Sequence, residues 1–237
     1  WLATVVVSGI SYLSYLLKRY VFHESGVLVS GIIGGLYSST ATISVLARKS
    51  RKASEQEANE YVAAMLLAVS MMFLRFMILI LIFSREIFTS IYPYLLIMSV
   101  VAAVVAWFIH SRHRRSKDMT DESEDEDSSN PLEFKVALIF ATLFVVFTVL
   151  THYTLVYAGT GGLNLLSFVS GLSDITPFIL NLLQNTGSVA VLVVVACSMQ
   201  AIISNILVNM FYALFFAGKG SKLRPWILGG FGTVIGV

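Results

Sequence analysis

Two charged residues lie inside apolar segments of this chain. Asp174 is the only acid within such a segment, and Arg75 is the only base well inside one. If these segments cross a bilayer, a charge at its centre costs at least ~2.5 kcal/mol, so such groups usually pair or line a pathway. The predicted chemistry is cation or proton binding at Asp174, with Arg75 as its counter-charge or as the partner of an anion. An ion pair that only locks the fold explains both residues equally well.

Hydroxyl residues cluster near a glycine pair, and a related cluster surrounds Asp174. Hydroxyls and carbonyls can replace an ion's hydration shell, but small residues such as Gly31 and Gly35 also let helices pack closely. Asn205 and Asn209 share a helix face, where they line a cavity or bond between helices. The metal is not identified. The candidate pathway residues are Ser38, Ser39, Thr40, Thr42, Arg75, Ser173, Asp174, Thr176, Asn205 and Asn209, and the candidate break or packing residues are Gly31, Gly34, Gly35, Gly171 and Pro177.

The composition is that of an integral membrane protein. Of 237 residues, 57% are apolar and 13% are charged, and the mean hydropathy is +0.80. The net charge of +2 does not indicate nucleic-acid binding. The single cysteine, Cys197, excludes an intrachain disulfide and a cysteine-based metal site. No catalytic motif occurs in a fitting context, so we expect neither an enzyme nor a cofactor.

Apolar segments divide the chain, since a membrane span needs roughly 20 apolar residues. Eight occur, at residues 1–17, 27–47, 61–83, 87–109, 134–158, 163–183, 187–217 and 225–237. We predict a first membrane repeat over 1–84, a linking helix over 85–110, a disordered basic-then-acidic loop over 111–133 and a second repeat over 134–217. Residues 218–237 are interpreted as the truncated start of a further helix.

The two glycine-rich segments align with each other without gaps at an offset of 136 residues. Four of seventeen positions are identical, and Ser38 aligns with Asp174. Each segment is followed by a long apolar segment that carries a polar residue, Arg75 in the first case and Asn205 in the second. This pattern predicts an internal duplication.

The distribution of basic residues favours one threading. If every segment crosses, nine of the Lys and Arg residues outside the membrane lie on one side and six on the other. If both glycine-rich segments return to the side they came from, fourteen of these residues lie on one side and one on the other. We therefore predict an all-α polytopic protein of two inverted repeats, each with a broken or re-entrant helix rich in Gly, Ser and Thr. A broken spanning helix is the alternative. The basic loops and acidic linker are expected on the cytoplasmic side of the cell membrane.

The motifs resemble those of a membrane domain of unknown function found C-terminal to the MgtC/SapB region in prokaryotic proteins. The matching residues are Gly34, Gly35, Leu36, Ser38, Ser39, Thr40, Ala41, Thr42, Arg75, Ser170, Gly171, Leu172, Asp174 and Asn205. The chain departs from the pattern at Thr176, Pro177 and Asn209, where Asp, Ala and Lys are usual. The loss of one acid and one base indicates a compensating pair or a different ion. The resemblance implies a link to cation homeostasis, magnesium included, but no settled activity.

These features predict a channel or secondary transporter for a small ion, with a cation favoured because the oxygen ligands suit hard cations. The alternative is a regulatory or assembly module that transports nothing and acts through its acidic loop. The expected partners are the lipid bilayer and a small ion, with no nucleic acid. A homo-oligomer and a cytoplasmic partner of the acidic loop are compatible with the sequence.

Overall fold

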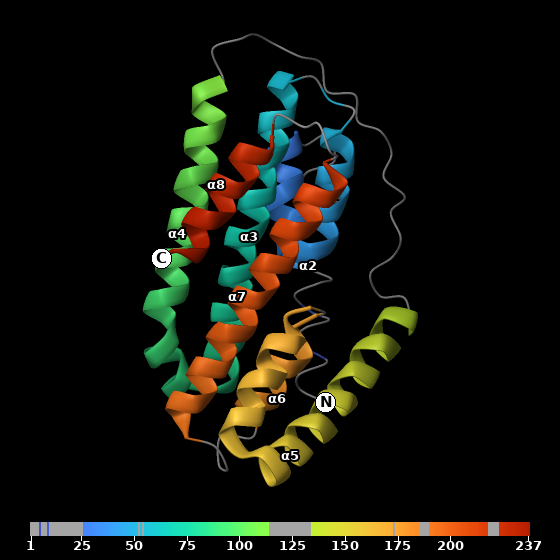
Figure 1. The fold of residues 1–237 in the computed structure, drawn as a ribbon, viewed down its shortest axis with the longest axis vertical. Coiled ribbons are helices and arrows are strands. Elements are labelled where there is room, and N and C mark those ends of the chain that lie inside the picture. The colour runs from blue at the N-terminus through green and yellow to red at the C-terminus, as the bar shows by residue number, and fades with distance from the viewer. Residues whose placement is uncertain are drawn as a thin grey trace. The chain divides into compact units, whose positions relative to one another are not determined.

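The structure is a computed structural model, and its regular elements are all helices within the described residues, which are 5, 9, 26–51, 53, 55–113, 134–172, 174–184, 190–217 and 223–237. Figure 1 shows them in chain order. They are α2 (Val27–Ser50), α3 (Glu55–Phe83), α4 (Arg85–His113), α5 (Phe134–Ser170), α6 (Thr176–Gln184), α7 (Val191–Phe216) and α8 (Arg224–Ile235). Most of the predicted first segment and of the predicted 111–133 loop lies outside the described residues.

Four of these helices are long and apolar enough to cross a membrane. They comprise Val27–Ser50, Glu57–Phe83, Arg85–Ser111 and Val191–Phe216. Large apolar side chains such as Ile82, Val104 and Phe215 lie exposed on their outer faces, where lipid rather than water makes burial unnecessary. The protein is therefore an all-helical membrane protein, as its composition predicts.

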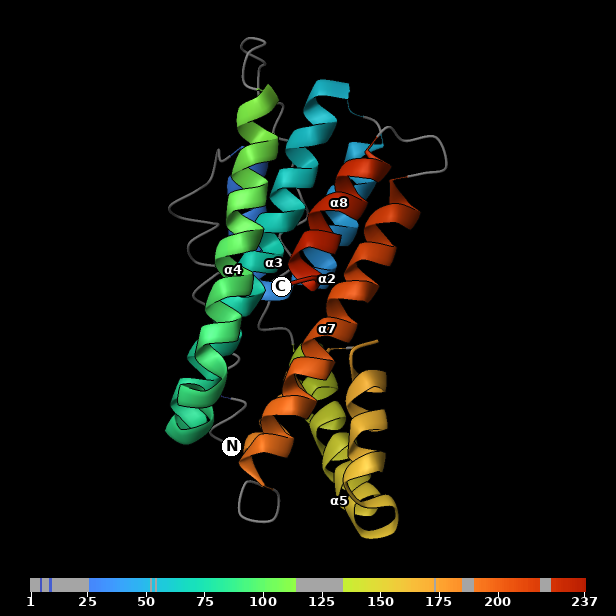
Figure 2. The same ribbon diagram turned by 60° about the vertical axis from the view of Figure 1, so that its left-hand side comes forward.

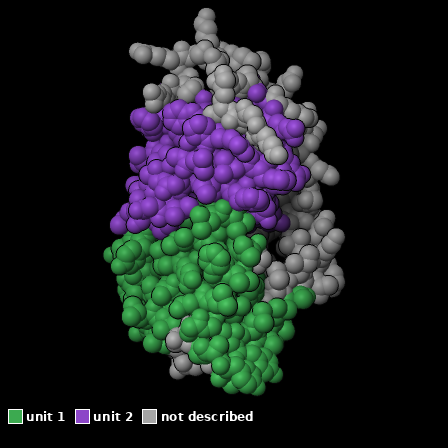
Figure 3. All heavy atoms as spheres, viewed as in Figure 1, with its two compact units in different colours: residues 1–8, 76–95, 132–208 green, residues 9–75, 96–131, 209–237 purple. Residues whose placement is uncertain are grey.

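The chain forms two compact units, each with most of its contacts within itself, which Figure 3 colours separately. Unit 1 comprises residues 1–8, 76–95 and 132–208, and unit 2 comprises residues 9–75, 96–131 and 209–237. Unit 2 thus contains α2 with the first part of α3, and unit 1 contains α5 and α6 with the first part of α7. Each glycine-rich segment belongs to a different unit. The predicted repeat boundaries stay a prediction.

Unit 2 contains a helix that reverses direction. Ser38, near the middle of α2, has extended dihedrals (φ −156°, ψ 106°), so the helix is interrupted there. A Cβ atom added to Gly34 would touch the Thr42 side chain, although eight residues of straight helix rise ~12 Å. The parts of α2 on either side of Ser38 therefore fold back toward each other, and Gly34 provides the space at the bend.

Unit 1 contains two interruptions. Gly159 lies within α5 with a φ of 58°, a left-handed conformation that glycine adopts without the steric cost of a side chain. The second part of α5 ends at Ser170, and the chain is non-helical at Asp174 until α6 begins at Thr176. Pro177, expected to break a helix, is the second residue of α6, where its missing N–H leaves no helical bond unmade.

In unit 2, the first part of α2 packs closely on α3. A Cβ atom added to Gly31 would reach the Ala64 backbone, and one added to Gly35 would lie 2.5 Å from the Ala68 Cα. Residue numbers rise together in both pairs, so the two helices run in the same direction. The part of α2 after Ser38 must therefore run in the opposite direction, because only a short connection joins its end at Ser50 to the start of α3 at Glu55. In both ribbon views α3 also lies beside α4 (Figures 1 and 2).

Unit 1 repeats this packing register between α5 and α7. The Ser167 hydroxyl donates a hydrogen bond to Gln200 Oε1 over 3.0 Å, and a Cβ atom added to Gly171 would touch the Ser204 side chain. Ser167 and Gln200 lie 136 positions after Gly31 and Ala64. Gly171 and Ser204 lie 136 positions after Gly35 and Ala68. This is the offset at which the two glycine-rich segments align. The same register therefore governs both helix pairs.

The close approach of α2 to α3 makes a direct prediction for Gly35→Ala. The new methyl group meets the Ala68 backbone, which cannot rotate away, so we expect the free energy of unfolding in mixed micelles to fall by about 1–3 kcal/mol. Gly232→Ala is the matched control, because a Cβ atom there meets nothing within 4 Å. Equal stability of both variants would contradict this packing.

Candidate functional site at the helix breaks

Ser38 caps the helix that follows the break in unit 2. Its Oγ accepts a hydrogen bond from the Ala41 backbone N–H at 3.4 Å, the position at which an N-cap side chain serves one of the free amides of a new helix turn. Ser39 is buried beside it. The Thr40 carbonyl accepts a hydrogen bond from the Ser44 hydroxyl at 2.8 Å. Ser38 therefore has a structural task that the sequence alone did not reveal.

Arg75 serves the other end of the same break. Its Nη1 donates a hydrogen bond of 2.7 Å to the Tyr37 carbonyl, the last carbonyl before Ser38. Hydrogen bonds from a charged donor are shorter and stronger than neutral ones. Arg75 is half-buried on α3, so it reaches from the neighbouring helix to a backbone carbonyl next to the interruption.

Asp174 caps α6 in unit 1. Its Oδ1 accepts a hydrogen bond from the Thr176 backbone N–H at 3.0 Å, and the side chain is exposed whereas Thr176 is fully buried. A carboxylate also suits the positive end of a helix dipole. Among the described residues this is the one hydrogen bond of Asp174, and it leaves Oδ2 without a described partner.

Asn205 and Ser204 hold the carbonyl end of this second break. Asn205 Nδ2 donates to the Gly171 carbonyl at 3.1 Å, and the Ser204 hydroxyl donates to the Phe168 carbonyl at 2.8 Å. Both donors come from α7 and both are buried. They bond carbonyls in the last turn of α5 and directly after it, as Arg75 bonds the carbonyl before the break in α2.

The two breaks thus have the same design in different units. An oxygen side chain, Ser38 or Asp174, caps the helix that begins, and a donor from the next long helix, Arg75 or Asn205, bonds the carbonyls of the helix that ends. Ser38 and Asp174 occupy aligned positions in the sequence. Arg75 and Asn205 are not related by the 136-residue offset, so similar side-chain donors reach the two breaks from different positions.

The remaining predicted residues take several positions. Thr42 lies against Gly34 within α2, and Asn209 is fully buried on α7 in unit 2, one turn after Asn205. Ser173 lies outside the described residues. Because Arg75 and Asp174 belong to different units, the ion pair between them stays a prediction. Within the described part of the chain, no group of three His, Cys, Asp or Glu residues gathers as a metal site would require.

Several buried polar contacts between helices were missed by the sequence analysis. Ser70 and Ser99 join α3 to α4, with their hydroxyls 3.0 Å apart. In unit 1, Asn181 Nδ2 donates to Thr148 Oγ1 at 2.7 Å. Single Ser, Thr and Asn residues in apolar helices carry no spacing signal, since each finds a partner only after the helices pack.

Comparison with known proteins supplies a family. Residues 5–217 match the model of a domain of unknown function, DUF4010. The chain belongs to this family. A protein of Aquifex aeolicus (strain VF5) with the name "Uncharacterized protein" is 27% identical over 200 residues, which cover 83% of this chain and 85% of the relative. No solved structure matches the chain. The resemblance to a domain of unknown function is confirmed, and its association with MgtC/SapB stays a prediction.

In this DUF4010 chain, the capping of α6 predicts different effects for two Asp174 variants. Asp174→Ala removes the acceptor of the Thr176 N–H and is expected to cost about 1 kcal/mol of stability, whereas Asp174→Asn keeps a side-chain oxygen and costs only a few tenths. Hydrogen exchange of the first α6 amides, with unfolding in mixed micelles, measures both. Faster exchange in Asp174→Asn than in Asp174→Ala would contradict the cap.

Removing the Arg75 donor has a second predictable cost. Arg75→Met removes the charged donor that bonds the Tyr37 carbonyl, so the free energy of unfolding should fall by about 1–3 kcal/mol, and Asn205→Leu should act similarly at Gly171. Arg75→Lys keeps a charged donor and should cost less. Leu74→Ala, at an exposed neighbour on the same helix, is the control. If Arg75→Met is no less stable than this control, the contact with Tyr37 carries no stability.

Proposed function

We propose that this protein transports a small ion, a cation rather than an anion, through the membrane. The observation that carries the proposal is Asp174, an exposed carboxylate at a helix break within an apolar segment. Binding of the Thr176 amide fixes Oδ1 and orients the group, while Oδ2 has no described partner. A carboxylate oxygen held in place beside interrupted helix backbone is a suitable ligand for a hard cation.

The repeated design of the breaks supports a transport architecture. Each unit has an interrupted helix, a capping oxygen and the same packing register, which is the geometry expected of a duplicated membrane protein. We infer that α2 and the segment 163–183 each enter the membrane and return to the side they came from, in opposite orientations. This threading agrees with the fourteen-to-one division of basic residues, and it assigns the basic loops to the cytoplasmic side of the cell membrane.

The contacts of Arg75 favour a cation over an anion. The guanidinium donates to the Tyr37 carbonyl, so stabilisation of the helix break already explains why a base occurs at this depth. The helix dipole gives the acid at the cap of α6 only a weaker reason, because it is worth about 0.3–1 kcal/mol against a cost of at least ~2.5 kcal/mol for a charge within the membrane. Asn, Ser or Thr caps a helix as well as Asp does or nearly so. Ser38, at the position that aligns with Asp174, caps a helix without a charge. The charge of Asp174 is therefore the feature that a cation pathway accounts for.

The threading makes a prediction about chemical labelling. In a Cys197→Ala background, single cysteines replacing Glu24 and Arg51, which flank α2, should react with an impermeant maleimide from the same side. A cysteine replacing the exposed Arg85, the first residue of α4, should react from the other side. Reaction of the Glu24 and Arg51 positions from opposite sides would mean that α2 crosses the bilayer.

Ion flux into proteoliposomes tests the function itself. Potassium, sodium, magnesium, protons and chloride should be compared, and we expect flux of one cation but not of chloride. Asp174→Asn should reduce that flux at least tenfold, because it keeps the cap of α6 and loses only the charge. Glu86→Gln, which removes one carboxylate at an exposed position of α4, serves as the matched control and should retain flux.

Each other outcome of the flux measurement has a definite meaning. Wild-type flux in Asp174→Asn would remove Asp174 from the pathway. Chloride flux that depends on Arg75 would replace the cation by an anion. No flux of any tested ion, from protein with intact helicity, would favour the regulatory alternative.

A further inference from the structure

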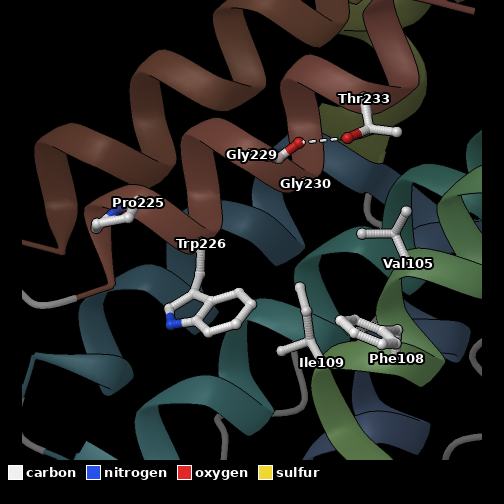
Figure 4. A pocket seen from close by; sticks show the side chains of 8 residues that line it. All are labelled: Val105, Phe108, Ile109, Pro225, Trp226, Gly229, Gly230 and Thr233. Carbon is white, nitrogen blue, oxygen red and sulfur yellow. Dashed lines mark hydrogen bonds between the residues drawn. The ribbon is translucent and has the colours of Figure 1, made fainter. Parts of the chain in front are cut away.

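A groove between α4 and α8 in unit 2 has a form suited to an apolar ligand. Its volume is about 320 Å³, at the lower end of the range for small-molecule sites. Figure 4 shows Phe108 and Ile109 from α4 and Trp226 from α8 extending into it. The Thr233 hydroxyl donates to the Gly229 carbonyl at 2.7 Å (Figure 4), so its hydrogen-bonding capacity is directed at its own helix.

Two adjacent glycines of α8 have different surroundings. A Cβ atom added to Gly230 would lie 2.7 Å from Leu66 Cδ1, so a side chain at Gly230 would displace the end of Leu66 on α3. A Cβ atom added to the exposed Gly229 would meet nothing within 4 Å. Gly229 lines the groove, so a side chain there would extend into the space that a ligand would take, whereas one at Gly230 would extend toward Leu66.

The two ends of the groove differ in charge. Figure 4 places Trp226 opposite Ile109, and Thr233 toward the Val105 end, so α4 and α8 run antiparallel along the groove. The exposed Arg224 precedes the groove on α8, and the half-buried His110 follows it on α4. The end near Trp226 therefore adjoins basic residues, and the other end is apolar. Trp at the boundary between apolar and polar regions is typical of a membrane interface.

We propose that this groove binds an acyl chain of an anionic phospholipid, with the headgroup phosphate at the Arg224 end. The acyl chain fits the apolar lining, and the guanidinium suits a phosphate through charge and paired hydrogen bonds. The lipid surrounds the exposed apolar faces of the spanning helices and so has direct access. The inference is independent of ion transport.

Quenching of Trp226 fluorescence by brominated lipids tests the site directly. The chain has three tryptophans, so Trp1→Phe with Trp107→Phe leaves Trp226 as the sole emitter. In proteoliposomes we expect brominated phosphatidylglycerol to associate about fivefold more tightly than brominated phosphatidylcholine, as one Arg near the headgroups predicts. Equal quenching by the two lipids would overturn the proposal.

Two variants in this background separate the groove from the bulk bilayer. Gly229→Leu fills the space above the helix and should abolish the preference, whereas Gly232→Leu should retain it, because Gly232 is equally open but does not line the groove. Arg224→Gln should remove the headgroup preference while both lipids still quench. A preference that survives both Gly229→Leu and Arg224→Gln would overturn the proposal. Quenching that falls only as protein density rises would assign the groove to a second copy of the chain instead.

Discussion

An interrupted helix in a membrane leaves backbone amides and carbonyls without helical partners, and the side-chain contacts at the two breaks follow from the need to satisfy these groups. In unit 2, Ser38 accepts from the amide end and Arg75 donates to the carbonyl end. In unit 1, Asp174 and Asn205 do the same. Once these groups are satisfied, non-helical backbone can persist inside a membrane protein. The proposed ion pathway makes use of such backbone.

The same contacts distinguish structural from functional residues. The carbonyls that Arg75 and Asn205 bond explain why these two residues occur in apolar helices. The close approach of α2 to α3 explains Gly31 and Gly35. Asp174 has a sufficient reason for its oxygen but not for its charge, because the aligned Ser38 caps a helix without one. The proposed cation pathway rests on that difference. It accounts for an acid in an apolar segment without requiring a pair with Arg75, which lies in the other unit.

Much of this arrangement follows from the sequence. Composition and segment length predict a helical membrane protein, and the 136-residue offset predicts which positions correspond. The clustering of Gly, Ser and Thr indicates where helices break. The partners of the breaks could not be predicted, because Arg75 and Asn205 occupy unrelated positions in the alignment and meet the carbonyls only after the helices pack. The capping role of Asp174 was missed because its charge, rather than its place before Thr176 and Pro177, directed the interpretation.

The most direct test of this account is the distance between spin labels at Leu28 and Lys49, measured by pulsed electron paramagnetic resonance in proteoliposomes. An uninterrupted helix would separate these positions by ~32 Å, at 1.5 Å per residue. Helix halves that fold back at Ser38 lie about as far apart as packed helices, so we expect a distance of ~10–20 Å. A single distribution near ~32 Å would contradict the reversal, and with it the matched design of the two breaks.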